Sequence, residues 1–250
     1  MLLPPPLDAT NSFAWQIPWD RAAPNSAADM TRLNAGPLGA IAVKNGVFVD
    51  AKTGKRIKFL ATNVGAEAAF PTKREADLRA AQIARSGINL VRLHHLNNGW
   101  ATDAGGAIWK KGRNWVEIDP AQVDKLDYFV AALIKRGIYV NMNLQVSREY
   151  VEELGFPASV RQLKSFAKKI DKINPRMIEL QREYAKDLLD RRNPYLGRMY
   201  RDEPGLAIVE INNENSLVGW PGESPGAGLD GFPEPFRSEI RAAWVGWLRK

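Results

Sequence analysis

Cysteine is absent from this chain of 250 residues, and histidine occurs only at His94 and His95. The lack of cysteine excludes disulfides, thiolate metal sites and cysteine nucleophiles, and it leaves the redox state of the compartment open. No run of 18 apolar residues occurs, so no segment is expected to cross a bilayer as a helix. The first residues also lack the basic start and apolar stretch of an export signal.

Several motifs of known chemistry are missing as well. The sequence contains no phosphate-binding loop, no dinucleotide-binding fingerprint and no G-x-S-x-G nucleophile motif. The adjacent His94 and His95 lack the third ligand and the spacing of a zinc site. The net charge is +7, but basic and acidic residues are mixed along 182–192 as on a solvated helix face. We therefore expect no metal, no cofactor and no nucleic-acid partner.

The chain divides into an arm and a larger unit. Residues 1–40 are rich in Pro, Ala and Asn and predict an irregular N-terminal arm, anchored by tryptophans. The remaining unit, 41–250, begins with a predicted β-hairpin. Its strands are expected at 47–49 and 57–60, around the turn signal of 50–54.

A repeated unit follows the hairpin, in which a charged helix end is followed by a glycine and an apolar run. Glycine suits the left-handed position after a helix, and the apolar run suits a strand buried on both faces. Alternating helices and strands predict an α/β fold with a parallel sheet and right-handed crossovers. The predicted strands are 57–63, 89–95, 138–145 and 206–213, and the predicted helices are 72–86, 120–136, one opening at Asn174-Pro175, and 236–249.

Polar residues recur with period two towards the ends of the later strands. In a parallel barrel, the outer face of each strand must be apolar because helices pack against it. These polar side chains should therefore point into the barrel, near its mouth. A purely structural hydrogen-bond network is the alternative explanation. The polar set comprises Arg92, His94, Asn141, Asn143, Gln145, Glu210, Asn212 and Glu214, and a bulge in the fourth strand would re-aim Asn213 instead.

These residues resemble glycoside hydrolase family 5, the cellulase-like retaining β-glycosidases of clan A. The resemblance runs from about residue 41 to the end, and its motifs are RLHH at 92–95, NMNL at 141–144 and IVEINNENS at 208–216. Ile17-Pro18-Trp19-Asp20 also looks like the leader of a bacterial subgroup. The resemblance implies a TIM (β/α)8-barrel type of fold, of which about the first four βα units, a half-barrel, are present.

The resemblance also implies roles for individual residues. Glu214 corresponds to the acid/base, Asn213 to the asparagine that binds the sugar 2-hydroxyl, and Arg92 to the arginine that orients the nucleophile. Tryptophans in mouth loops would stack on sugar rings, and Trp109 and Trp115 are further candidates. The implied substrate-binding residues are His94, His95, Asn143, Gln145, Trp100 and Trp220.

The retaining mechanism needs a second carboxylate roughly 5 Å from the first. Glu210 cannot supply it, because four residues along a strand span about 13 Å. The family's nucleophile is a glutamate that ends strand seven, and this sequence ends after its fourth helix. We therefore expect the chain alone to be inactive, as a truncated gene product or as a half-barrel that pairs with a second half or with itself.

The expected function is cellulase-like or mannanase-like hydrolysis of O-glycosidic bonds in a β-linked polysaccharide or oligosaccharide, without a membrane partner. The family suggests an extracytoplasmic location, periplasmic or secreted. Two alternatives remain: a catalytically inactive carbohydrate-binding or assembly fragment, and a metal-dependent barrel hydrolase that uses His94 and His95.

Overall fold

The structure is a computed structural model, and it describes residues 29–34, 38–216 and 231–250. Most of the predicted arm therefore lies outside the described residues, as do Trp15, Trp19 and the leader-like segment. The described part of the arm contains a 3₁₀ helix, η2 (Thr31–Asn34). The Asn34 side chain donates to the carbonyl of Ile88 at 2.8 Å, which fastens this helix beside the start of the second sheet strand.

The predicted N-terminal hairpin is present, but its ladder lies elsewhere. Strand β1 (Ile41–Lys44) pairs antiparallel with β2 (Val47–Asp50), around a turn at Asn45 and Gly46, which both have positive φ. The expected partner of β2 makes only an isolated bridge between Val49 and Arg56. The prediction of strands at 47–49 and 57–60 was therefore wrong for the second strand, because the Asn-Gly signal forms the tighter turn.

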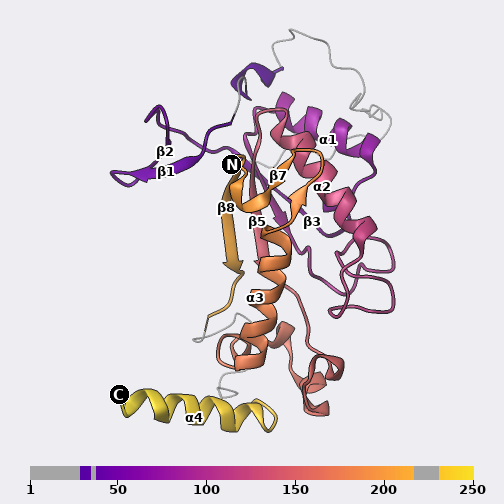
Figure 1. Ribbon diagram of the computed structural model, residues 1–250, viewed down its shortest axis with the longest axis vertical. Helices are drawn as coiled ribbons and strands as arrows, with labels where there is room; N and C mark the ends of the chain where they lie inside the picture. The colour runs from indigo at the N-terminus through magenta and orange to yellow at the C-terminus, as the bar shows by residue number, and fades with distance from the viewer. Residues whose placement is uncertain (1–28, 35–37, 217–230) are drawn as a thin grey trace, which may run out of the picture.

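Four parallel strands form the main sheet, in the order β3-β4-β5-β8. The four predicted strands are thus confirmed, although the first begins at residue 61 rather than 57. The first strand starts later because the Leu60 N–H donates to the Asn89 side chain, at 2.8 Å, rather than to a neighbouring strand. The strands are β3 (Ala61–Gly65), β4 (Leu90–His94), β5 (Tyr139–Gln145) and β8 (Leu206–Asn212) (Figure 1).

Four α-helices occur close to the predicted positions. The first helix begins with a capping box, in which the Glu75 N–H donates to the Thr72 hydroxyl and the Thr72 N–H donates to the Glu75 carboxylate. At the second helix the Asp119 side chain accepts the Ala121 N–H, whereas the Asp119 N–H donates to the Ile108 carbonyl, so no capping box forms. The helices are α1 (Lys73–Arg85), α2 (Pro120–Ile134), α3 (Pro175–Leu189) and α4 (Phe236–Leu248).

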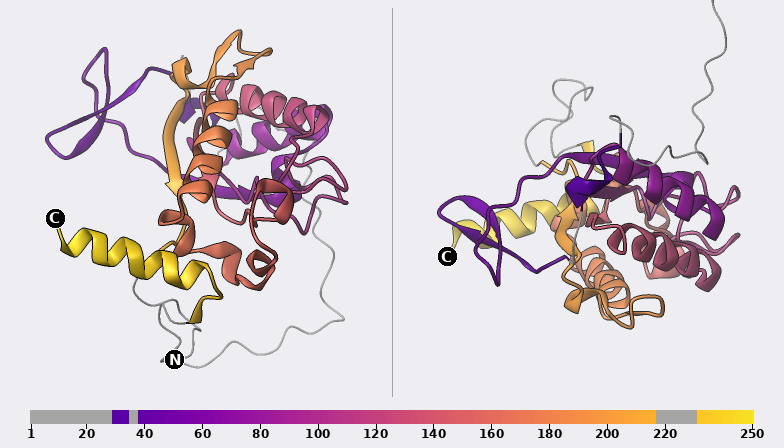
Figure 2. Two further views of the ribbon diagram at one scale, coloured as in Figure 1. Left: turned by 60° about the horizontal axis from the view of Figure 1, so that its bottom comes forward. Right: turned by 90° about the horizontal axis from the view of Figure 1, so that it is seen from above.

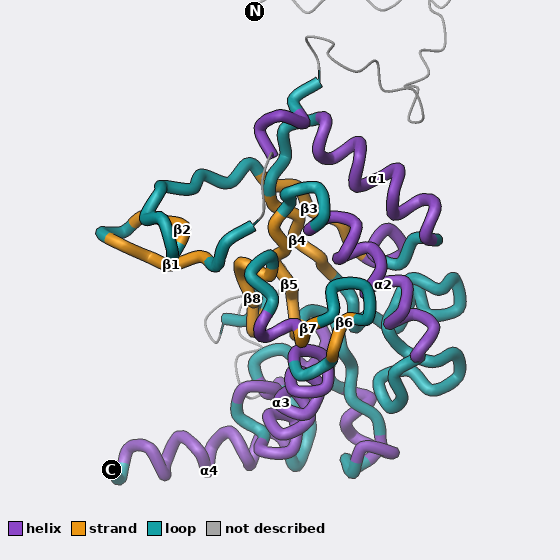
Figure 3. The backbone as a smooth tube through the Cα atoms, turned by 45° about the horizontal axis from the view of Figure 1, so that its top comes forward, coloured by secondary structure: helices purple, strands orange, loops and turns teal. Residues whose placement is uncertain are grey.

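Helices cover one face of the sheet. Helices α1, α2 and α3 lie on the same side of the strands (Figures 2 and 3), and α2 and α3 contact β5. The outward side chains of the central strands are fully buried there, as the predicted apolar outer face requires. This core contains Val91, Leu93, Val140 and Met142 from the strands and Leu126, Phe129, Val130 and Leu133 from α2.

A second cluster of buried residues joins the long connection after β5 to α3 and to the start of α4. The connection, 146–174, contains four short 3₁₀ helices, η4 to η7 (Glu152–Leu154, Ala158–Gln162, Ser165–Ala167 and Ile170–Lys172). Two-residue strands β6 (Arg192–Asn193) and β7 (Arg198–Met199) then lead by η8 (Tyr200–Asp202) to β8. The second cluster includes Tyr150, Phe156, Ile170, Met177, Phe236 and Ile240.

The last strand and the last helix are much less covered. Ile211 of β8 is 75% exposed, and Val209 is 38% exposed. Beyond its buried first turns, α4 extends away from the sheet (Figure 1) and exposes Trp244 and Trp247. Across the described ranges, no helix is both long and apolar enough to span a bilayer.

Candidate active site

The inner face of the sheet carries the polar residues that the alternation predicted. The parallel register places Asn63 of β3, Arg92 of β4 and Asn141 of β5 opposite one another. One step further along the strands, Asn143 of β5 lies opposite Glu210 of β8. The polar side chains of neighbouring strands therefore gather on the face that the helices leave open.

Arg92 is the centre of this group. Its Nε and one terminal nitrogen donate to the two oxygens of Glu210 at 2.9 and 2.8 Å, which is a bidentate ion pair. The same terminal nitrogen reaches Asn213 Oδ1 at 2.8 Å, and the other reaches Asn63 Oδ1 at 3.2 Å. Hydrogen bonds from Arg92 hold the pKa of Glu210 below its usual value. Glu210 is therefore an ionised acceptor at neutral pH.

The chain turns sharply where β8 ends. The Asn213 N–H still bonds the Gln145 carbonyl at 2.9 Å, and the Asn213 side chain is buried against Arg92. Glu214 then takes a left-handed conformation with φ of 46°, and its side chain is exposed. Strict alternation thus ends at Asn212, and the re-aiming of Asn213 expected from a bulge occurs at this turn. The register irregularity of β8 lies earlier, opposite Val140 and Asn141.

The two histidines follow one another at the end of β4. His94 Nδ1 makes a short contact with Asn143 Oδ1, and His95 Nδ1 lies 3.1 Å from the Ser147 hydroxyl. Burial lowers the pKa of His94. Burial, together with the charges of Lys168 and Arg92 and the unfavourable protonation of two adjacent imidazoles, lowers the pKa of His95 to about 4. Both imidazoles are therefore neutral at pH 7 and able to hydrogen-bond a sugar hydroxyl.

Gln145 belongs to a neighbouring buried network rather than to the group around Arg92. The Asn97 amide donates to Gln145 Oε1 at 2.9 Å and to the Leu144 carbonyl at 3.0 Å. Asn97 also accepts the Trp109 indole N–H at its carbonyl, at 3.0 Å. Gln145, 4% exposed, thus supports the loop after β4.

The tryptophans divide between the rim and the core. Trp100 is 57% exposed and stands edge-on to His95, with ring centroids 5.1 Å apart. Trp109 is 2% exposed and belongs to the main core, so its ring is not offered to a ligand, whereas Trp115 is half-buried and packs partly against that core. The Trp109 ring packs against Tyr184 of α3, with ring centroids 5.7 Å apart, where apolar burial outweighs exposure to a ligand. Trp220 lies outside the described residues.

The connection after β5 brings further side chains to the rim, which the sequence analysis missed. Phe166 lies 6.0 Å from Trp100 between ring centroids, and Lys168 Nζ lies 5.9 Å from the Phe166 ring centroid. Burial lowers the pKa of Lys168, whereas the nearby charge of Glu214 opposes this shift. The connection has neither period 2 nor period 3.6, so no sequence pattern predicted this approach.

A buried carboxylate from the same connection meets the turn after Glu214. The Asn215 amide donates to the two oxygens of Asp171 at 2.7 and 3.0 Å and to Asn212 Oδ1 at 3.0 Å. Asp171 is 0% exposed, and burial raises its pKa although Asn215 and Asn212 oppose the shift. Asn215 belongs to the family-like motif at 208–216, but no sequence pattern indicated its partner Asp171.

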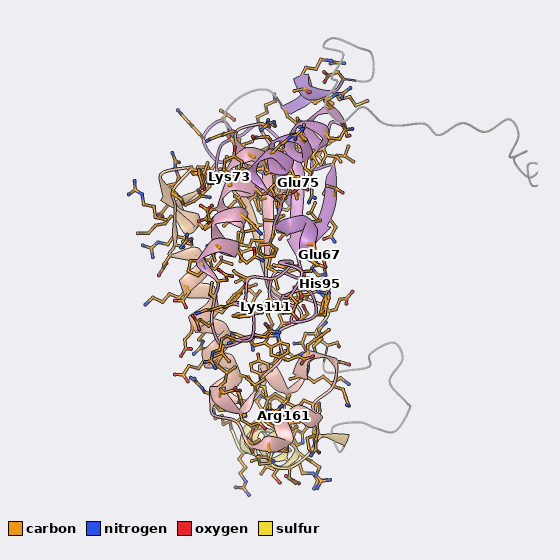
Figure 4. The ribbon with its side chains drawn as sticks, turned by 90° about the vertical axis from the view of Figure 1, so that its right-hand side faces the viewer. Glu67, Lys73, Glu75, His95, Lys111 and Arg161 are labelled. Atoms are coloured by element: carbon orange, nitrogen blue, oxygen red, sulfur yellow. The ribbon has the colours of Figure 1, made fainter. Side chains whose placement is uncertain are left out.

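The two ends of the strands carry different residues. Figure 4 shows His95 and Glu67, which follow the adjacent strands β4 and β3, at the same level of the molecule. A depression of about 870 Å³ lies at the opposite ends of the strands, lined by Arg85, Arg136 and Arg198 among others. The described residues include no group of three histidine or acidic side chains placed to hold a metal ion. The absence of a metal or cofactor stays a prediction.

Comparison with known proteins finds similarity in structure but not in sequence. No family model matches the chain, and no curated protein matches it. The endo-1,4-beta-mannanase from Rhizomucor miehei matches with a TM-score of 0.55 and 20% identity, over 82% of this chain and 55% of that one. The glycoside hydrolase family 5 mannosidase from the same organism matches with a TM-score of 0.53 and 15% identity, over 73% and 50% of the two chains.

The chain therefore spans about half the length of the solved structures that it matches. At this identity the likeness concerns the fold, and it agrees with the family resemblance of the sequence motifs. The four βα units form part of a (β/α)-barrel fold, with Arg92, Asn213 and Glu214 toward the carboxyl ends of the strands.

Proposed function

We propose that this chain supplies the acid/base half of a retaining glycoside hydrolase site, with Glu214 as the proton donor. The observation that carries the proposal is the link from Arg92 to Asn213, because it fixes the residue next to Glu214 at the mouth end of the strands. Glu214 itself is exposed and follows in a left-handed turn. A carboxyl group at such a rim can reach the oxygen of a glycosidic bond.

The neighbouring groups suit this chemistry. A glycosidic oxygen leaves poorly unless it is protonated, so the site needs one carboxyl group that can donate a proton. Glu210 is held ionised by its bidentate pair with Arg92, which leaves the donor role to Glu214. Asn213 accepts from Arg92 through Oδ1, so its Nδ2 can donate to a sugar hydroxyl. Neutral His94 and His95 and the exposed ring of Trp100 would contact the sugar.

The second carboxylate is proposed to come from polypeptide that covers the open edge of β8. The described sheet has four strands, so it contains no counterpart of the strand-seven glutamate that the resemblance implies. The edge of β8 and the exposed Val209 and Ile211 offer a pairing surface for further βα units. On this proposal the chain alone binds carbohydrate and does not turn it over.

A β-1,4-linked mannan is the substrate class to test first. The solved structures that it resembles include an endo-1,4-beta-mannanase and a mannosidase, and these names support the choice without extending to this chain. A β-1,4-glucan is the matched comparison, because the sequence motifs are also cellulase-like. Action on such polymers would suit a periplasmic or secreted location.

Isothermal titration of the chain with mannohexaose and cellohexaose tests the proposal, together with a reducing-sugar assay. We expect millimolar to micromolar binding, equivalent to about 4 to 8 kcal/mol, without turnover. Trp100→Ala should weaken binding, whereas Trp247→Ala, which changes an exposed tryptophan of α4, should not. Glu214→Gln should leave binding in place.

Two outcomes would contradict the proposal in different ways. Failure of the chain to bind either hexasaccharide would remove the glycoside-binding site. Turnover by the chain alone, abolished by Glu214→Gln, would keep the acid/base and overturn the expected inactivity. Binding without turnover, even when the open edge of β8 is supplied with further barrel units, would favour the carbohydrate-binding fragment instead.

A further inference from the structure

We propose that Asp171 is a positioning residue for Glu214: it clamps Asn215 and so fixes the turn that presents the acid/base. The inference rests on the proposed function, since it assigns a partner to the same site. It names a residue from a different part of the chain, 43 positions before Glu214, on the connection between β5 and α3.

Asn215 is held almost completely by the segment 169–172. Its Nδ2 donates to both oxygens of Asp171, at 2.7 and 3.0 Å, and its Oδ1 accepts the backbone N–H of Lys169 at 2.8 Å. The ammonium group of Lys172 bonds the Asn215 carbonyl. One short segment therefore contacts the donor and the acceptor of the side chain and the backbone of the residue that follows Glu214.

The clamp is itself anchored to the body. Gln181 of α3 donates to the Asp171 carbonyl at 2.7 Å, and the Asn212 amide lies 3.4 Å from both Asp171 and the Gln181 side chain. Asp171 has no exposed surface. Its position is thus fixed by α3 on one side and by the end of β8 on the other.

Glu214 needs such support because its conformation is unfavourable on its own. A residue with a β-carbon in the left-handed region costs roughly 1 to 2 kcal/mol and persists only where its surroundings fix it. On the N-terminal side, Asn213 is tied to Arg92 and to the Gln145 carbonyl. On the C-terminal side the support comes from Asn215 and hence from Asp171.

A buried carboxylate is a costly way to build a purely structural contact. Asp171 loses its hydration, and its neighbours are amides and lysines rather than a bidentate arginine. A carboxylate nevertheless has two acceptor oxygens that one amide nitrogen can bond, whereas an asparagine at the same place has only one. The geometry points to fixed orientation of the turn as the gain for this cost.

The test replaces the acceptor and then restores the pair. Asp171→Asn keeps the size of the side chain but removes one of its two acceptor oxygens. The double variant Asp171→Asn with Asn215→Asp exchanges donor and acceptor, and aspartate at 215 still accepts the Lys169 N–H. Asp187→Asn, which changes an exposed carboxylate of α3, is the matched control.

Two measurements on the full chain separate the possible outcomes. In the first, the HN–Hα coupling and Cα shift of Glu214 report its backbone conformation by nuclear magnetic resonance, without any sugar. We expect Asp171→Asn to move both away from left-handed values, and the double variant to restore them. In the second, affinity for mannohexaose should fall roughly tenfold in Asp171→Asn, or about 1.4 kcal/mol, and recover in the double variant.

The outcomes distinguish this inference from the proposed function. If no variant and no wild-type chain binds the hexasaccharide, the glycoside site fails, but the conformation of Glu214 still tests the clamp. If Asp171→Asn leaves the Glu214 signals and the affinity unchanged, Asp171 does not position the turn. If Asp171→Asn does not fold, a folded double variant with normal Glu214 signals supports the clamp, and an unfolded one overturns it.

Discussion

The centre of the sheet and its last strand differ sharply in how they are covered. Strands β4 and β5 place Val91, Leu93 and Met142 under the helices with no exposed surface. Strand β8 in the same sheet leaves Ile211 exposed, and the helix that follows it exposes Trp244 and Trp247. Strands of a parallel sheet are ordinarily buried on both faces, so β8 lacks the cover that β4 and β5 have.

The candidate site spans both regions. Arg92 belongs to the covered centre, whereas Glu210, Asn213 and Glu214 belong to the exposed edge. The acid/base of the proposed reaction therefore follows a strand in which no residue is fully buried. Hydrogen bonds from Arg92 to Asn213 and from Asn215 to Asp171 hold the end of β8 in place, as helix packing does for the central strands.

The largest effect should come from removing a ring in the covered centre. Phe129→Ala empties a fully buried position of α2 and should lower the free energy of unfolding by about 3 to 5 kcal/mol. Ile211→Ala, on exposed β8, should change it by less than about 0.5 kcal/mol. Urea denaturation followed by circular dichroism measures both. Equal losses would show that β8 is packed as tightly as the centre.

The next effect concerns the link between the two regions. Arg92→Met removes the bidentate partner of Glu210 and should cost about 2 kcal/mol, a value reduced because both side chains remain 27% exposed. Arg92→Lys, which keeps the charge but loses the fork, should recover only part of it. Hydrogen exchange at the Asn213 amide should quicken in both variants. Unchanged exchange there would mean that Arg92 does not order the edge.

A smaller, pH-dependent effect should come from His95, at the end of covered strand β4. Its pKa is lowered to about 4 in the folded protein, so between pH 6.5 and 4 the unfolded chain binds a proton that the folded one does not. This group therefore destabilises the fold progressively as the pH falls through that window. The melting temperature of His95→Gln should fall less between pH 7 and pH 4 than that of the wild type.

Asp127, Glu149 and Asp171 have raised pKa values through burial, and they act in the opposite direction as the pH falls. They are present in both proteins, so the difference between the two curves isolates His95. Parallel curves would show that the imidazole titrates normally and is not desolvated at the rim.

The smallest effect on stability is expected on α4. Trp244 and Trp247 stack on each other with ring centroids 5.2 Å apart, but both are largely exposed. Replacing both by Ser should change the free energy of unfolding by at most about 0.5 kcal/mol, yet it should reduce self-association of the chain, because it removes two large exposed apolar side chains. Sedimentation velocity measures association. Identical sedimentation of the variant and the wild type over a wide concentration range would show that these tryptophans make no contact between copies of the chain.

Much of the fold could be predicted from local sequence. Glycines at 87, 137 and 205 precede three of the four sheet strands, and Thr72 with Glu75 marks the start of α1 as a capping box. The hairpin was misjudged because two turn signals follow each other within ten residues. Both are turns, and only the ladder shows that Asn45-Gly46 joins the strands.

The site could be predicted only in part. Period-two alternation and the family motifs identified Arg92, Asn213 and Glu214, and whether these residues act on a sugar remains a prediction. Trp100 and Trp109 are the same residue type in the one connection between β4 and α2, yet one is exposed and the other is core. Asp171 carried no pattern at all, because its connection has no regular period.

By itself, the sequence determined the series of βα units and the polar inner face, because helix caps, glycine positions and side-chain alternation act between residues a few positions apart. Only the tertiary structure decided that Arg92 meets Glu210, 118 positions away, and that Asp171 meets Asn215. Such pairs depend on strand register and on where a long connection packs. Both are set by the burial of the whole sheet rather than by the neighbours of either residue.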